Sequence, residues 1–390
     1  MDIQSSINLF ADDTSLYVIV EQPREAFELL QSDILKISAW ADRWLVTFNP
    51  SKSESLLVSR KRNTFPHPVL SMFGQLIPEV TEHKHLGVFL SSDCSWHSHI
   101  DYILDKAWKR VNVMRKIKFS IDRKSLKTIY TSFVRPILEY ADVVWSNCTN
   151  YEVDQLDKIQ HECARIATGA TKLVSLEKLH EESPWESLSE RRYKHRLVLF
   201  FKMYTNKTPE YLSTLIPHPA EHRYDLRNPN NVRGIPSRTT LYFNSFLPSV
   251  IRDWNLLPDS VRNLTTLSSF KDYLNKDIRC IPKYYYVGIR KLQVLHTRLR
   301  TKCSALNQHL FLRNISPTPL CQCGQMETNA HYLLECTLYT DCRQKLFNNL
   351  QNYDIDENLL LYGNTSLPDE DNVNIFTNVH CYIAESKRFL

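Results

Sequence analysis

Residues 7–17 read INLFADDTSLY, and this stretch decides how the rest of the chain is interpreted. Asp12 and Asp13 are adjacent and stand between two short apolar runs of β-forming residues. This pattern predicts a β-hairpin with two carboxylates at its tip. We expect apolar strand residues, Ile7 and Leu9 among them, to pack on a core and fix the acids in space. Carboxylates held rigidly in this way can bind divalent metal ions.

The composition is that of an ordinary globular protein. The 390 residues are 43% hydrophobic and 23% charged, which predicts about two or three domains. The net charge of +5 permits nucleic-acid binding but does not by itself predict it. What would predict binding is a cluster of cations on one face of the protein. The first residues are acidic and polar, and the apolar runs are shorter than a membrane span. We therefore expect an intracellular protein of the nucleus or cytoplasm, with no membrane partner, whose ten cysteines are reduced or metal-bound.

Hydrophobic periodicity predicts an α+β chain that starts mixed and becomes mainly helical. A hairpin over residues 3–20, a helix over 23–45 and short strands to about residue 92 come first. Helical patterns follow, and the one over residues 123–145 is interrupted at Pro136. The last region carries most of the cysteines and ends in a polar, acidic tail around residues 369–371. The expected divisions are residues 1–92, 93–147, 148–216, 217–283 (a Pro/Asn/Arg-rich linker and a small helical unit) and 284–390.

A group of cations follows the mixed region. The apolar residues between 100 and 114 recur at steps of three and four, and most of the nearby cations fall on the opposite side of that helix. Such a face binds phosphates without reading sequence, or it is simply solvated; periodicity alone leaves both interpretations open. The candidate nucleic-acid-binding residues are Lys106, Lys109, Arg110, Lys116, Arg123 and Lys124.

A Cys/His group near the C-terminal end forms a candidate zinc site. Cys321 and Cys323 are separated by one residue, seven residues precede His331, and four more precede Cys336. Three thiols and one imidazole are a suitable tetrahedral ligand set for zinc. Gly324 provides the tight turn that would bring the first two sulfurs to one ion. Buried free thiols are the alternative, and Cys303 and Cys342 are substitutes if one ligand is misassigned.

An ordered series of motifs resembles the reverse transcriptases of jockey-type non-LTR (LINE-like) retrotransposons. The acidic pair lies in FADD, which is similar to the aromatic-x-Asp-Asp box of that family. The later motifs resemble, in the family's order, the palm segment after the catalytic hairpin, the primer grip and entry to the thumb, the thumb helix and a C-terminal region. These motifs are NPSKSESLL at 49–57, HLGVFL at 85–90 with WHSHI at 96–100, FVRPILEY at 133–140, and SFLP at 245–248 with WNLLP at 254–258.

The resemblance implies roles for particular residues. Asp12 and Asp13 would help to hold two Mg²⁺ ions, and Lys52 would lie near the nucleotide phosphates as a charge stabiliser or proton donor. Residues 1–92 would be a partial palm and 93–147 thumb-like helices that contact an RNA template and DNA primer, or their RNA–DNA duplex. Residues 148–216 would be a helical extension, and 284–390 the Cys/His region and tail. The resemblance also favours Zn²⁺ at the Cys/His group.

The chain departs from the family in one respect. The family's metal site takes a further aspartate from an earlier palm strand, and its fingers hold template and nucleotide. We expect both to be absent here, so that this C-terminal portion of an RNA-directed DNA polymerase is inactive alone. The alternatives are a non-catalytic nucleic-acid-binding protein with a zinc knuckle-like module, or a helical interaction protein in which the acids and cysteines are incidental.

Overall fold

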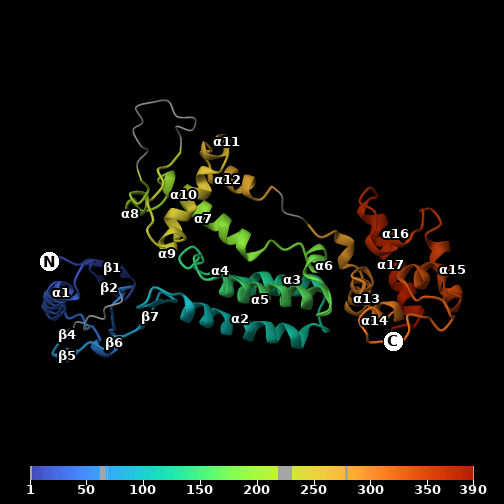
Figure 1. Cartoon of the computed structure of the whole chain (residues 1–390), viewed down its shortest axis with the longest axis horizontal. Coiled ribbons are helices and arrows are strands. Elements are labelled where there is room, and N and C mark those ends of the chain that lie inside the picture. Colours follow the sequence, from blue (N-terminus) through green and yellow to red (C-terminus); the bar gives the residue numbers. More distant parts are fainter. Residues whose placement is uncertain (1, 62–66, 68, 218–230, 277–279, 390) are drawn as a thin grey trace. The chain divides into compact units, whose positions relative to one another are not determined.

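The computed structural model describes residues 2–61, 67, 69–217, 231–276 and 280–389 (Figure 1). The chain divides into two compact units, Met1–Tyr102 and Ile103–Leu390. The first unit is mixed α and β and the second is almost entirely helical, so the chain is α+β as the periodicity predicts. Most of the expected linker, residues 218–230, lies outside the described residues.

The first unit begins with the predicted hairpin, in which β1 and β2 pair antiparallel and Phe10 lies opposite Asp13. In the described part of this unit, one long helix follows, and then six strands of two to four residues. The sequence pattern also predicts short strands in this region. They pair as β3 with β6 (parallel), β4 with β5 and β7 with β8 (both antiparallel). The elements are β1 (Ser6–Phe10), β2 (Asp13–Tyr17), α1 (Pro23–Trp44), η1 (Pro50–Lys52), β3 (Ser55–Leu56), β4 (Ser71–Met72), β5 (Gln75–Leu76), β6 (Glu79–Val80), β7 (Glu82–His85) and β8 (Val88–Ser91).

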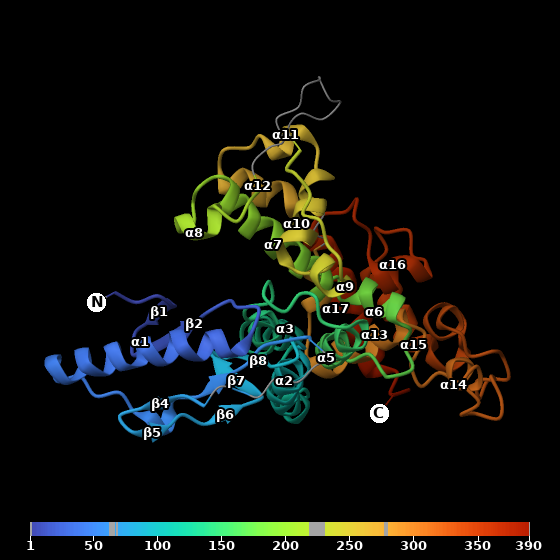
Figure 2. The ribbon, with the colours of Figure 1, turned by 60° about the vertical axis from the view of Figure 1, so that its left-hand side comes forward.

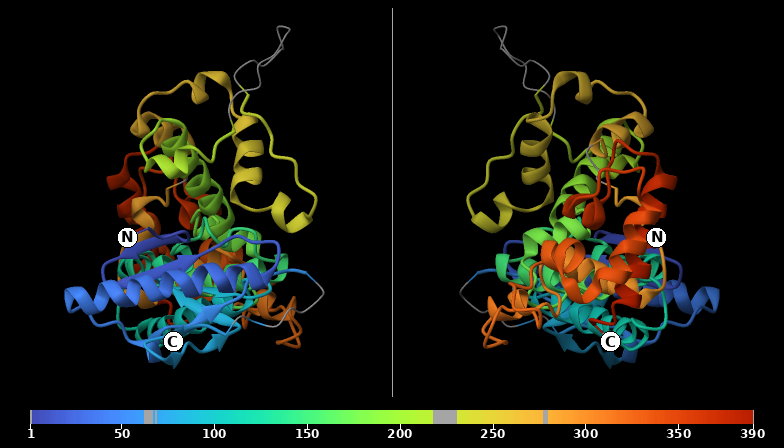
Figure 3. Two further views of the ribbon diagram at one scale, coloured as in Figure 1. Left: turned by 90° about the vertical axis from the view of Figure 1, so that its left-hand side faces the viewer. Right: turned by 90° about the vertical axis from the view of Figure 1, so that its right-hand side faces the viewer.

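The core of the first unit is small. Helix α1 lies between the β1–β2 hairpin and the β4–β5 pair (Figures 2 and 3). Ile34 of α1 packs with Leu70 and Met72, and β2 adds only the half-buried Leu16. All five residues of β1 are exposed. The expectation that strand residues seat the hairpin on a core is therefore wrong for β1, because a two-stranded ribbon with one neighbouring helix leaves most of its surface in water.

The second unit consists of helices, and α2 crosses the boundary between the two units. Capping boxes begin α5 and α7, where a hydroxyl side chain and the glutamate three residues later bond each other's backbone N–H groups. The long elements are α2 (His97–Ile117), α5 (Asn150–Thr168), α7 (Leu188–Tyr204), α13 (Arg290–Arg300) and α17 (Asp369–Glu385). The shorter ones are α3 (Arg123–Ile129), η2 (Tyr130–Val134), α4 (Arg135–Glu139), α6 (Leu176–Glu182), α8 (Glu210–Ser213), α9 (Thr240–Phe243), α10 (Phe246–Asn255), α11 (Asp259–Arg262), α12 (Leu267–Leu274), η3 (Lys283–Tyr286), α14 (Asn307–Phe311), η4 (His331–Glu335), η5 (Thr337–Tyr339), α15 (Thr340–Asn349) and α16 (Glu357–Tyr362).

The predicted interruption at Pro136 takes the form of a π-helix. Proline has no backbone N–H to donate, and its ring crowds the turn before it. The chain widens over η2, so that the N–H of Arg135 bonds to the carbonyl of Tyr130, five residues earlier. Helix α4 then ends at Glu139, earlier than the sequence pattern indicates, and Trp145 is buried in the turn that follows.

Several separate apolar cores lie within the described residues of the second unit. In one, α10 and α12 pack on α7 (Figure 2). This core surrounds the fully buried Trp254, whose ring centre lies 5.2 Å from that of Phe200. Another is built from the elements between η3 and α17. The acidic tail expected around residues 369–371 is wrong: these acids form the first turn of α17, which buries Phe376 and Val379. Carboxylates in a first turn favour the helix by facing the positive end of its dipole.

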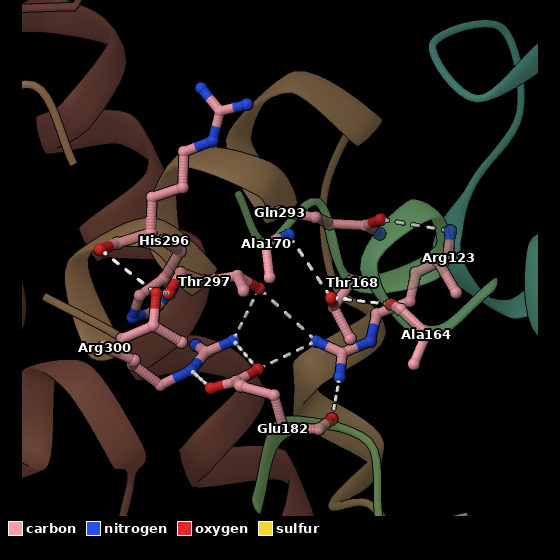
Figure 4. A network of polar contacts seen from close by, with 12 residues as sticks. Arg123, Ala164, Thr168, Ala170, Glu182, Gln293, His296, Thr297 and Arg300 are labelled. Atoms are coloured by element: carbon pink, nitrogen blue, oxygen red, sulfur yellow. Dashed lines mark hydrogen bonds and ion pairs between the residues drawn. The ribbon is translucent and has the colours of Figure 1, made fainter. Parts of the chain in front are cut away.

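A buried ion network joins α3, α6 and α13 (Figure 4). Glu182, at the end of α6, accepts from Arg300 through both carboxylate oxygens, at 2.6 and 3.1 Å, and from Arg123 at 3.3 Å. Arg123 also donates to the backbone carbonyl of Glu182, and Thr297 accepts from Arg300 at 3.0 Å. These three charged residues are at most 4% exposed, so they bind one another in place of water.

Within the described ranges, no helix combines the length and the apolar character that crossing a membrane requires.

Candidate metal centre and acidic hairpin

Four predicted zinc ligands lie together in the structure. The ligand atoms of Cys321, Cys323, His331 and Cys336 all lie within 4.8 Å of one another. The Sγ atom of Cys336 lies 3.6 Å from that of Cys321 and 3.9 Å from that of Cys323. A tetrahedral zinc ion with bonds of about 2.3 Å to sulfur would hold its thiolates about 3.8 Å apart. We call these four residues the Cys/His cluster.

A tight turn positions the first two cysteines. Gly324 has a φ of 89°, in the left-handed region, and its N–H donates to the carbonyl of Cys321. The N–H of Cys321 in turn donates to the carbonyl of Gln325, and an isolated antiparallel bridge joins Leu320 to Met326. The sequence predicted the role of Gly324. Two sulfurs one residue apart can bind the same ion only if the chain makes a tight turn at this point.

A wide helical turn positions the other two ligands. Residues 331–335 form the π-helix η4, and the N–H of Cys336 bonds to the carbonyl of His331. The Nε2 atom of His331 faces Cys323 Sγ at 3.1 Å. Its Nδ1 atom is buried without a hydrogen bond and lies 3.7 Å from a carboxylate oxygen of Glu335. Nε2 is therefore the nitrogen that faces the sulfurs.

The electrostatics of the cluster suit a divalent cation. A hydrogen bond from the backbone of Gln325 lowers the pKa of the Cys323 thiol, whereas burial raises the pKa of Cys336. A buried thiol that resists ionisation loses its proton readily only when a cation replaces it. The donor types, the separations and the burial of three of the four residues all fit zinc.

The two substitute cysteines lie elsewhere. Cys303 packs with Ala164 and Val174, and its sulfur accepts from Arg313 at 2.7 Å. Cys342 packs against the core formed between η3 and α17. Among the described residues, neither belongs to a group that could hold a metal ion.

The acidic pair occupies the tip of the hairpin, and among the described residues it does not belong to a group of three or more possible metal ligands. Asp12 lies in the turn and Asp13 begins β2, and both are exposed. No third His, Cys, Asp or Glu of the described residues joins them in a possible ligand set. Lys52 ends η1 and is exposed.

Five of the six candidate nucleic-acid-binding cations reach the surface. Lys106, Lys109, Lys116 and Lys124 are exposed, and the half-buried Arg110 stacks on Phe133 with its guanidinium 4.0 Å from the ring centre. Lys109 is paired with Asp105 at 2.6 Å.

Arg123 is the exception, and its assignment to this surface is wrong. Its side chain is 1% exposed and is held by Glu182 in the network of Figure 4. A guanidinium held in this way cannot reach a phosphate, because it is buried and would have to give up its bonds to Glu182.

The sequence interpretation missed a buried carboxylate beside the hairpin. Asp33 of α1 accepts the backbone N–H groups of Gln4 and Ser5 at 2.9 and 2.6 Å, and Lys36 donates to it at 3.0 Å. Although burial opposes ionisation, these hydrogen bonds outweigh it and lower the pKa of Asp33 to about 2. A signal was present: Asp33 stands on the apolar face of α1, three residues after Leu30.

Comparison with curated proteins identifies relatives of the chain. It is 25% identical over 197 residues to the probable RNA-directed DNA polymerase from transposon X-element of Drosophila melanogaster, which covers 49% of the chain and 21% of that protein. It is 23% identical over 350 residues to the retrovirus-related Pol polyprotein from type-1 retrotransposable element R1 of Bradysia coprophila, covering 86% of the chain and 32% of the relative. It is 25% identical over 169 residues to the RNA-directed DNA polymerase from mobile element jockey of Drosophila funebris, covering 42% and 18%.

The chain thus spans about a fifth to a third of the length of these relatives. No family model matches it, and no solved structure matches it significantly. The chain is related in sequence to the RNA-directed DNA polymerases of non-LTR retrotransposons of the jockey and R1 kind, and it corresponds to a part of them.

Proposed function

We propose that the chain is the palm-to-C-terminal portion of a non-LTR retrotransposon reverse transcriptase and acts on nucleic acid. The observation that carries this proposal is the similarity to the R1 Pol polyprotein, which extends over 86% of the chain and so reaches well beyond the acidic box. In this proposal residues 1–92 are a partial palm, 93–147 thumb-like helices, 148–216 a helical extension, 217–283 a linker and small helical unit, and 284–390 the Cys/His region.

We propose further that this portion does not polymerise by itself. Asp12 and Asp13 supply two exposed carboxylates, and no third ligand among the described residues joins them. Paired metal ions in an intact polymerase activate the primer hydroxyl and stabilise the leaving pyrophosphate, and that work needs a complete ligand set.

Primer extension on an RNA template with Mg²⁺ tests this proposal. We expect no extension that depends on Asp12, and Asp42→Asn, at an exposed position of α1, provides the matched control. Extension by the unaltered chain that Asp12→Asn abolishes and Asp42→Asn leaves intact would show a working site.

The partner that we propose is an RNA template with its DNA primer, bound as a duplex along α2 and the start of α3. Exposed lysines on these helices, Lys106, Lys116 and Lys124 among them, would replace counterions on the phosphates. Binding of this kind is independent of sequence and weakens steeply with salt. A protein that used these helices for protein contacts alone would show no such dependence.

A salt titration of RNA–DNA duplex binding separates the two cases. Each phosphate contact contributes about 0.9 to the slope of log affinity against log salt, so Lys116→Gln with Lys124→Gln lowers its magnitude by about 2. The exposed Lys271→Gln on α12 is the control. A flat salt response of the unaltered chain would contradict duplex binding.

For the Cys/His cluster we propose a structural zinc site with Cys321, Cys323, His331 and Cys336 as ligands. A zinc ion bound there would cross-link the cysteine turn to η4 and would add its binding free energy to the stability of this region. Metal analysis of purified protein should give one zinc per chain, and Cys321→Ser with Cys323→Ser should remove it. The exposed Cys381→Ser is the matched control. Unchanged zinc content in the double variant would contradict the site.

A further inference from the structure

Glu327 is a buried acid that lies between the two halves of the Cys/His cluster in the sequence. It follows Cys323 by four residues and precedes His331 by four. Its side chain is only 3% exposed. A carboxylate removed from water in this way is stable only if positive charge and N–H donors replace its hydration.

Arg388 supplies that charge from beyond the end of α17. Its Nε donates to one carboxylate oxygen of Glu327 at 2.6 Å, and its terminal nitrogen donates to the other at 2.7 Å. This paired geometry is the strong form of an arginine–carboxylate contact. The backbone N–H of Asn307, at the start of α14, donates to Glu327 at 2.5 Å, and Arg388 also bonds the carbonyl of Ala305 at 2.9 Å.

Glu327 closes the base of the turn that carries the first two ligands. Its N–H donates to the carbonyl of Pro319 at 2.9 Å, next to the bridge between Leu320 and Met326. The side chain of Asn307 donates to the carbonyl of Leu320 at 2.6 Å. Both arms of the cysteine turn are therefore attached to the residues that Glu327 and Arg388 hold.

The same residue also precedes the second pair of ligands. Two residues after Glu327, the buried Asn329 donates to the carbonyl of Leu299 at 3.1 Å, at the end of α13. The helical turn with His331 and Cys336 begins there. Glu327 thus lies in the segment between the cysteine turn and η4.

We propose that Glu327 and Arg388 are the positioning pair of the metal centre: neither binds the ion, and together they fix the cysteine turn relative to His331 and Cys336. This inference rests on the zinc site proposed above and adds to it the residues that set its geometry. Without the guanidinium, the buried carboxylate loses its counter-charge and turns towards solvent, and this movement loosens the contacts that Glu327 makes at the base of the turn. Residues bonded directly to metal ligands typically change metal affinity by 10- to 100-fold when they are replaced, and this pair acts one step further out, through the backbone of the turn.

Chelator competition measures the zinc dissociation constant of the unaltered chain and of Arg388→Gln, Glu327→Gln and Arg388→Lys. We expect zinc to bind about 10-fold more weakly to the two glutamine variants, the lower end of the range for residues that bond ligands directly. Arg388→Lys should give an intermediate value, because lysine restores the charge but not the paired contact. The control is Lys345→Gln, which breaks the exposed pair between Lys345 and Glu385, the last residue of α17. It should bind zinc as the unaltered chain does.

Two further measurements distinguish positioning from general stability. The visible spectrum of the Co²⁺-loaded variants should still show three thiolates and one imidazole, since no ligand is removed. The double variant Glu327→Gln, Arg388→Gln should bind zinc no more weakly than the worse single variant, because the two side chains act as a unit. A purely structural pair would lower the unfolding temperature in chelator and leave the zinc-induced rise in that temperature unchanged.

The outcomes separate this inference from the proposals it builds on. Zinc affinity in Arg388→Gln and Glu327→Gln equal to that of the unaltered chain would overturn the inference alone. Failure of the unaltered chain to bind zinc would overturn the metal centre and the inference together. The salt dependence of duplex binding is measured independently, so it tests the proposed polymerase function whichever result is found.

Discussion

Ala11 holds the tip of the hairpin in a backbone conformation that alanine rarely adopts. Its φ is 52°, in the left-handed region. An L-residue there costs roughly 1–2 kcal/mol, and hairpin turns that need a positive φ usually take glycine. The chain therefore keeps a strained residue directly before its two acids, which restricts the directions in which Asp12 and Asp13 can point.

Replacing Ala11 by glycine should relieve that strain. We expect Ala11→Gly to stabilise the hairpin by about 1 kcal/mol, because glycine reaches positive φ without a steric cost. Slower hydrogen exchange of the β1 and β2 amides would report it. Ala41→Gly is the opposite control: Ala41 is fully buried in α1, where glycine should destabilise. Faster exchange of the hairpin in Ala11→Gly would show that the turn is not strained.

A pair of buried histidines makes the C-terminal core sensitive to acid. His296 lies 3.2 Å from His380 and 3.0 Å from the carbonyl of Leu360. That carbonyl can only accept, so His296 donates to it through Nε2 and accepts from His380 through Nδ1, with both rings neutral. Burial lowers the pKa of His380 to about 4 and places that of His296 well below its ordinary value.

The sign of the pH effect follows from these shifts. Below an ordinary histidine pKa of about 6.5, the unfolded chain binds protons at these two histidines and the folded core does not. The contribution of the pair to the free energy of unfolding is therefore full above pH 6.5 and decreases as the pH falls towards 4. We expect a loss of about 3 kcal/mol between pH 6.5 and pH 5 in urea unfolding, about half of it from each histidine. His380→Gln, which keeps a side-chain N–H, should flatten the profile. The same pH dependence in that variant would assign the effect to other groups.

At the scale of single elements, Gly169 allows the end of α5 to pack closely against α13. It ends α5 with a φ of 82°, and a Cβ atom placed on it would lie 2.5 Å from a methyl carbon of Val294. Gly169→Ala should therefore cost about 3 kcal/mol, from the combined crowding and backbone strain. Urea unfolding measures this cost.

Combining the change with Val294→Ala should recover the crowding part, so that the double variant loses less than the sum of the two single losses. Strict additivity would mean that the two residues do not press on each other.

Elements were predictable from the sequence where the signal is local. The repeat of apolar residues predicted α1 and α2, and Pro136 predicted the interruption after α3. The spacing of cysteine and histidine residues within a segment of 16 residues also identified the four members of the Cys/His cluster. Helix α17 was not predicted, because its first residues are acidic and the segment was interpreted as a tail. Its apolar residues, Phe376 and Val379 among them, do recur at helical spacing.

Contacts between distant segments were not predictable. Arg123 is 59 residues from Glu182, and Arg300 is 118 residues from it. On its own helix Arg123 resembles its solvent-exposed neighbour Lys124. Only the packing of α3, α6 and α13 against one another determines which of two adjacent cations is buried, and no local pattern encodes that packing.

At the scale of the whole second unit, Glu182 connects the helical region to the C-terminal one. Glu182→Gln would leave two buried guanidiniums that face each other without a counter-charge, which should cost about 3–5 kcal/mol in urea unfolding. The matched control is Lys283→Gln, which breaks an exposed pair with Asp369 and should cost less than about 1 kcal/mol. Equal losses in the two variants would mean that solvent or neighbouring groups replace the carboxylate.

The π-helix before Pro136 has a consequence for comparing this chain with its relatives. Each residue of a regular helix turns the chain by about 100°, so the additional residue in a π turn rotates everything after it by about that angle. A relative without the proline would need one residue fewer at this point to present the same side chains to the same neighbours. An ungapped alignment through residues 130–134 would therefore match inward-facing positions of one protein with outward-facing positions of the other.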